Sequence, residues 1–271
     1  MEGHILKPLI AFLMMLAAAP PTAANQRVMS LNLCGDQMVL YYPHKNRLLS
    51  VSHLAHDATL SPMHEKARDL KTARLDFESI LANQPSHVIL ARHHMQTLAP
   101  FAKRHDITLI PLDIPNSPKS WIDFVQQLTK YNIIEGNSVR QDIEKTLKNI
   151  KKEGENLEQK TIIFLAPRGF ALGIDHLAVQ WSVLAGFTPK IKTKGWSTKI
   201  NYEQLIADPP DVLVMEQSIG SSISTRTLPE NIQNLLRSQG TVIIEQMPSA
   251  WTCPGPWGAE FAVKLQELHR K

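Results

Sequence analysis

The sequence predicts an α/β fold with two lobes, each a mainly parallel sheet flanked by helices, joined by one long backbone helix. Three observations lead to this prediction: two matching segments, apolar runs that alternate with helical stretches, and a chain longer than one ordinary domain. The chain has 271 residues, whereas single domains commonly have about 100 to 150. We expect an N-terminal lobe at 25–115, a linking helical segment at 116–158 and a C-terminal lobe at 159–271.

The first 24 residues predict a secretory signal peptide. Lys7 precedes the apolar run 8–19, and Thr22 and Ala24 occupy the −3 and −1 positions of a cleavage site. The run is shorter than the roughly 20 residues of a transmembrane helix. The first cysteine, Cys34, comes too late to carry a lipid anchor. We therefore expect export to the periplasm as a soluble protein.

The two matching segments indicate a duplicated unit. Residues 77–90 read FESILANQPSHVIL, and residues 202–215 read YEQLIADPPDVLVM, so Glu and Pro have the same spacing in both. Proline disfavours helical geometry in the residue before it, which predicts a short helix that ends just before the Pro. The aliphatic run that follows lacks polar alternation, as is typical of strands buried on both faces of a parallel sheet.

Other strands and helices are expected to alternate along the chain, which favours helices on both faces of each sheet. The further expected strands are Arg27 to Leu33, Leu48 to Ser52, Thr108 to Leu112, Thr161 to Ala166 and Thr241 to Glu245, and the further expected helices are Gln96 to His105 and Gln180 to Ala185.

The segment between the lobes predicts the linking helix. It runs from Ser120 to Leu157 with an interruption at Gly136, after which Asn137 provides a good N-cap. Apolar residues then recur on one helical stripe, and about twenty residues of helix span roughly 30 Å. One long helix would tie the lobes together with little hinge freedom, although a surface helix within one lobe gives the same pattern. The stripe consists of Val139, Ile143, Leu147, Ile150 and Leu157.

The charge pattern argues against nucleic acid as a partner. The formal net charge is +4, and basic residues are interleaved with acidic ones, as in 145–160, whereas nucleic-acid binders concentrate Lys and Arg on one face. Catalytic signatures are also missing. His64 begins a zinc-protease pattern, but Arg68 stands where the second His must be, and there is no Gly-x-Ser-x-Gly elbow. We expect a protein that is not an enzyme, with an exported enzyme as the least favoured alternative.

The order and spacing of these features resemble those of the periplasmic-binding family for ferric siderophores, haem and vitamin B12. The resemblance rests on the opening strand 27–33, the two Glu-containing segments, the linking helix, and Trp251 ahead of a final helix. It implies a monomeric solute-binding subunit that holds its cargo between two lobes. It also implies delivery to an ABC importer permease in the inner membrane, with Glu78 and Glu203 docking onto the permease.

The residues after the expected strand ends are the candidates for cargo binding, because ligands of open α/β sheets bind beyond the carboxyl ends of the strands. Arginines suit anionic groups, and aromatic rings can pack on a flat macrocycle. The candidate ligand-binding residues are Cys34, Asp36, His53, Arg92, His93, Arg168, Phe170, Trp196, Trp251 and Thr252.

The expected cargo is a metal chelate, namely a ferric siderophore, haem or a corrinoid, and no intrinsic cofactor is expected. Ala91 stands where the resemblance implies an aromatic residue. Together with the Arg and His residues, this favours an anionic iron chelate or haem over vitamin B12. The alternative is a carrier of bare zinc or manganese, with His53, His56, Asp57 and either His93 or His94 as ligands.

Cys34 and Cys253 are the two cysteines of the chain, expected at the carboxyl ends of strands in different lobes. An oxidising compartment permits a disulfide between them, which would restrain the opening of the lobes. Ligation of a metal or haem by thiolates, and two free buried thiols, are the alternatives that the sequence leaves open.

Overall fold

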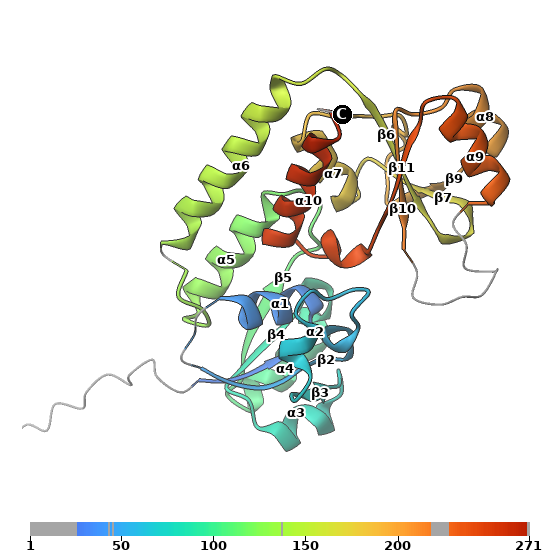
Figure 1. Cartoon of the computed structure of the whole chain (residues 1–271). Helices are drawn as coiled ribbons and strands as arrows, with labels where there is room; N and C mark the ends of the chain where they lie inside the picture. The colour runs from blue at the N-terminus through green and yellow to red at the C-terminus, as the bar shows by residue number, and fades with distance from the viewer. Residues whose placement is uncertain (1–25, 43, 45, 137, 218–227, 270–271) are drawn as a thin grey trace, which may run out of the picture.

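The computed structural model describes residues 26–42, 44, 46–136, 138–217 and 228–269, and these residues form two α/β lobes (Figure 1). The expected signal peptide at 1–24 and the expected N-cap at Asn137 lie outside this part of the chain. No helix in the described part is both long enough and apolar enough to cross a membrane.

The first lobe contains a sheet in the order β3-β2-β1-β4-β5, with every neighbouring pair parallel. Short 3-10 turns follow β2 and β4 at His53–His56 and Arg92–His94. The elements in chain order are β1 (Arg27–Ser30), α1 (Leu33–Tyr41), β2 (Arg47–Ser52), α2 (His64–Ala67), β3 (Lys71–Ala73), α3 (Phe77–Asn83), β4 (His87–Ala91), α4 (Met95–Arg104) and β5 (Thr108–Leu112).

The second lobe contains a sheet in the order β11-β10-β6-β7-β9, with β8 paired to β6. Strands β6, β10 and β11 are parallel, whereas β7 runs antiparallel to both β6 and β9. The elements in chain order are β6 (Thr161–Ala166), β7 (Phe170–Leu172), α7 (Leu177–Leu184), β8 (Thr188–Pro189), β9 (Ser197–Lys199), α8 (Tyr202–Ala207), β10 (Val212–Glu216), α9 (Glu230–Ser238), β11 (Val242–Gln246) and α10 (Pro256–Glu267).

The duplicated sequence segments form the same unit in both lobes. Each is a short helix followed by an inner strand: α3 leads into β4, between β1 and β5, and α8 leads into β10, between β6 and β11. Each helix also begins at an N-cap of the same kind. The Asp76 carboxylate accepts a hydrogen bond from the Ser79 backbone N–H at 2.6 Å, and the Asn201 side chain accepts one from Glu203 N–H at 2.8 Å.

The first strand is shorter than expected. It ends at Ser30, because the side chain of Asn32 accepts a hydrogen bond from the Gly35 N–H at 3.0 Å and starts α1 at Leu33. The expectation that Cys34 follows a strand end is therefore wrong: Cys34 lies in the first turn of a helix.

The linking segment contains α5 (Ser120–Lys130) and α6 (Val139–Glu155). Helix α6 has 17 residues and is about 25 Å long at 1.5 Å per residue. It runs along one side of the molecule from the first lobe to the second (Figure 1). Ile143 and Ile150 of the expected stripe are buried, whereas Leu157 lies beyond the helix end.

The lobes are joined by more than this helix. A disulfide links Cys34 in α1 to Cys253 just before α10. Of the three states that the sequence left open for the two cysteines, the structure therefore contains the disulfide. The Ser249 N–H also donates a hydrogen bond to the Thr59 carbonyl at 2.7 Å. One cluster of buried apolar side chains extends through both lobes and includes Val28 of β1 and Phe164 of β6. The lobes therefore share part of their core.

Candidate functional site

A cleft of about 240 Å³ lies between the lobes. It is found beyond the carboxyl ends of the strands, since Glu216 is the last residue of β10 and Pro115 follows β5. This is the position in which open α/β sheets bind ligands. Leu60 and Pro115 come from the first lobe, and the second lobe contributes His176, Leu177, Trp196, Glu216, Pro248, Trp251 and Thr252.

Trp196 gives the cleft an accessible aromatic surface. Its side chain is 49% exposed and lies edge-to-face with the ring of His176, with the centroids 5.4 Å apart and an interplanar angle of 86°. A flat apolar group entering the cleft could pack on this ring.

His176 caps α7 with its own side chain. Its Nδ1 accepts a hydrogen bond from the Ala178 backbone N–H at 3.2 Å. Burial lowers the pKa of His176 to about 4. The imidazole is therefore neutral at neutral pH, and because Nδ1 is an acceptor, the ring proton is on Nε2.

Glu216 and Trp251 form the inner wall of the cleft. Burial raises the pKa of Glu216 to about 7, and a hydrogen bond from Trp251 opposes part of this rise. Trp251 is only 1% exposed and packs against Phe164 and Phe261, with ring centroids 5.7 and 5.1 Å away. Trp251 is thus mainly a core residue and exposes very little of its side chain to the cleft.

Three of the ten sequence-derived candidates, Trp196, Trp251 and Thr252, are among the described residues that line the cleft. Asp36 is not among them, because the early start of α1 turns its side chain into the first lobe. It is fully buried and accepts hydrogen bonds from the Ser52 N–H at 3.1 Å and the Ser52 hydroxyl at 2.5 Å. Cys34 is in the disulfide, so it offers no thiolate.

The arginines expected at the cleft are not among the described residues that line it. None of the described residues that line it is Lys or Arg. Arg92 forms an ion pair with Asp113, in which Nη2 donates to Oδ2 at 2.9 Å, beside a separate hollow against α5. Phe170 is 40% exposed in β7. The candidates outside the described lining are Cys34, Asp36, Arg92, Phe170, His53, His93 and Arg168.

Sequence reasoning missed His176 as a cleft residue. It follows β7, a strand of three residues that is too short to appear as an apolar run. The available signal was a polar cap ahead of the apolar stretch 177–179. No such signal marked Leu60, Leu177 or Pro248, because Leu is common in protein cores and Pro is common in loops.

The residues proposed as ligands for a bare metal are not brought together. Within the described ranges, no group of three or more His, Cys, Asp or Glu side chains could hold a metal ion. The structure therefore gives no support to the zinc or manganese alternative.

Glu78 and Glu203 occupy equivalent places in the two lobes. Each is the second residue of its helix, α3 or α8, and each is exposed. They are thus two accessible carboxylates on duplicated helices.

Comparison with known proteins finds the same fold in solved structures. No family model matches the sequence, and no curated protein matches it. The periplasmic haem binding protein of Vibrio cholerae superposes with a TM-score of 0.69 and 15% identity, covering 90% of this chain and 98% of its own. The periplasmic vitamin B12 binding protein of the same organism gives 0.67 and 14%, covering 90% and 96%.

A third neighbour is the periplasmic haem-binding protein of Roseiflexus sp. RS-1, in its apo form. It superposes with a TM-score of 0.66 and 18% identity, over 90% of this chain and 99% of its own. The match therefore extends over nearly the whole length of each protein, lobes and linking helix included. The chain has the two-lobed fold of the periplasmic binding proteins for vitamin B12 and haem.

Proposed function

We propose that the protein is the periplasmic solute-binding subunit of an ABC importer, which captures a metal chelate between its lobes and delivers it to the permease. The observation that carries the proposal is the cleft at the strand ends, lined by both lobes of a fold whose solved examples bind vitamin B12 or haem. Residues 1–24 would direct export, consistent with this role.

The chemistry of the cleft favours a cargo whose metal is already fully coordinated by its own chelator. A histidine that binds a metal through Nε2 normally carries its proton on Nδ1 and donates it to a neighbour. In His176, Nδ1 instead accepts from Ala178, so the ring is unsuited to ligation. Trp196 and the apolar lining provide packing without a metal bond.

Visible spectroscopy tests this cargo class. We expect cyanocobalamin or a ferric siderophore to bind the purified protein with an absorption spectrum close to that of the free chelate. Trp196→Ala should weaken binding about tenfold, as loss of an aromatic anchor does, while His176→Ala should leave the bound spectrum unchanged. A haemin complex whose Soret band depends on His176 would contradict the fully coordinated cargo while leaving the carrier role standing.

Delivery to the permease would use Glu78 and Glu203. Equivalent carboxylates on two related lobes offer a symmetric pairing surface to a two-fold permease, and complementary charges set register and encounter rate. Within the described chain neither residue has an ion pair that would have to break first.

Charge reversal separates docking from capture. The Glu78→Lys/Glu203→Lys variant should bind cargo with unchanged calorimetric affinity and abolish uptake by cells, because both contacts become repulsive. Glu153→Lys, an exposed change on α6, is the matched control and should transport normally. Normal uptake by the double variant would refute the docking assignment.

A further inference from the structure

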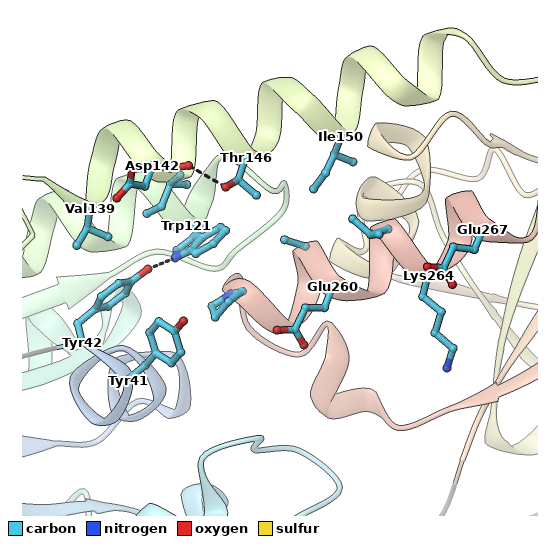
Figure 2. Close-up of a pocket in the computed structure, with 14 residues that line it drawn as sticks. Tyr41, Tyr42, Trp121, Val139, Asp142, Thr146, Ile150, Glu260, Lys264 and Glu267 are labelled. Atoms are coloured by element: carbon cyan, nitrogen blue, oxygen red, sulfur yellow. Dashed lines mark hydrogen bonds between the residues drawn. The ribbon is translucent and has the colours of Figure 1, made fainter.

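A second cavity lies along the linking helix, apart from the cleft. It has a volume of about 540 Å³ and is an open groove lined by α5, α6, α10 and the end of α1 (Figure 2). We call it the hinge-side groove. None of its described lining residues is shared with the cleft, so the groove is a separate site.

The surface of the hinge-side groove is apolar and partly aromatic. Tyr41, Tyr42 and Trp121 lie at one end, and Trp121 Nε1 donates a hydrogen bond to the Tyr42 hydroxyl at 2.6 Å (Figure 2). Tyr41 is 42% exposed and Val263 is 45% exposed, whereas large apolar side chains are more often buried. Volumes of about 300 to 1,000 Å³ with apolar walls are typical of small-molecule sites.

The rim of the groove is acidic. Asp142 comes from α6, and Glu260 and Glu267 come from α10 (Figure 2). Lys264 also lines the groove, but its Nζ donates a hydrogen bond to Gln246 Oε1 at 2.9 Å. Within the described part of the chain, no ion pair neutralises the three carboxylates.

We propose that the hinge-side groove binds a small organic cation with an aromatic or aliphatic body. The apolar part would pack against Val263 and the aromatic end of the groove. The positive group would lie near Asp142 and Glu260, with the exposed ring of Tyr41 adding attraction for a cation. An anion of the same shape meets like charges at the rim, so the site discriminates by charge sign.

Isothermal titration of the full chain with phenylbutylammonium, and with phenylbutyrate as the anion of matched shape, tests the proposal. We expect one cation bound per chain and binding of the anion at least about tenfold weaker. Asp142→Asn/Glu260→Gln should weaken cation binding about tenfold, since each exposed charge pair contributes a factor of a few. Glu144→Gln, on the opposite face of α6 from the groove, should have no effect.

Two more variants locate the bound cation. Ala259→Trp would fill the groove and should abolish binding, whereas Trp196→Ala alters the cleft and should leave cation binding unchanged. The proposal is overturned if cation and anion bind equally, if neither binds at millimolar concentration, or if the cation is lost in Trp196→Ala but kept in the charge variant.

Discussion

Glu216 places a carboxyl group at the end of an inner strand, beside Trp251 and away from bulk water. Burial raises its pKa to about 7, because a charged carboxylate loses hydration in such a position. The side chain therefore changes charge near neutral pH, inside the cleft where the cargo is proposed to bind.

Glu216→Gln should reduce the dependence of stability on pH. The folded protein holds this proton up to about pH 7, whereas the unfolded chain releases it near pH 4.3. The stabilisation is thus complete below about pH 4.3 and is lost as the pH rises through about 7. We expect the free energy of unfolding of the Gln variant to exceed that of wild type by up to about 3 kcal/mol at pH 8. The difference should be smaller at pH 5.

Urea denaturation at the two pH values measures this effect. Asp36, whose pKa burial also raises to about 7, contributes the same sign in both proteins and cancels in the difference. Glu245→Gln changes an exposed residue on the adjacent strand β11 and is the matched control for the loss of one carboxylate. If Glu216→Gln raised the free energy of unfolding equally at pH 5 and pH 8, burial would not raise the pKa of this carboxyl.

The sequence located some cleft residues and not others for identifiable reasons. Trp196, Trp251 and Thr252 were found because they follow expected strands or lie in loops near them. Asp36 was misplaced because the cap at Asn32 starts a helix early, and a helix turns successive side chains through 100° where a strand alternates them. Asn32 was not recognised as a helix cap because it lies inside the segment that was expected to be a strand.

At the scale of elements, helix α6 meets the second lobe at a very close contact. A Cβ added to Gly154 would lie 2.7 Å from the backbone carbon of Ala185 and 2.8 Å from the nitrogen of Gly186. Gly186 itself has φ +100°, a conformation that glycine adopts without strain. Two glycines thus allow the backbones of the linking helix and the turn after α7 to touch.

Gly154→Ala should destabilise the protein by about 1 to 3 kcal/mol, since overpacking a rigid contact outweighs the gain in helix propensity of about 1 kcal/mol. Chemical denaturation measures the change. Lys148→Ala, an exposed substitution on the same helix, should stay within about 0.5 kcal/mol of wild type. A stabilised Gly154→Ala would mean that the contact relaxes freely.

The regular elements were the predictable part of the fold. Strands β5 and β6 begin and end at the expected residues, Thr108–Leu112 and Thr161–Ala166, because buried parallel strands give uninterrupted apolar runs. The short strands β7, β8 and β9 have two or three residues each, and that length carries no periodicity. Their pairing depends on tertiary contacts, since β7 and β8 pair with β6 and β9 pairs with β7.

At the scale of the whole molecule, the disulfide is a second covalent connection between the lobes. It joins residues 219 positions apart, so in the unfolded chain it closes a very large loop. Loops of this size give bridges a stabilising effect of about 2 to 5 kcal/mol. Together with the Ser249 to Thr59 hydrogen bond, the bridge limits how far the lobes separate.

Cys34→Ser/Cys253→Ser should lower the free energy of unfolding by about 2 to 5 kcal/mol and broaden the distribution of distances between the lobes. Spin labels on the exposed residues Glu78 and Glu203 would report that distribution. Wild type treated with a reductant should behave like the double variant, which separates loss of the bond from the effect of two buried hydroxyls. A distribution as narrow as that of the oxidised protein would show that the shared core alone fixes the lobes.

The place of the bridge also relates the two cavities to each other. Thr252, on one side of Cys253, lines the cleft, and Pro256, on the other, lines the hinge-side groove. Both cavities have walls from both lobes, so a change in the angle between the lobes would alter the volume of each. A rotation of the lobes about the bridge that changed one cavity would therefore change the other. A molecule bound in the hinge-side groove would then limit how far the cleft between the lobes can open or close.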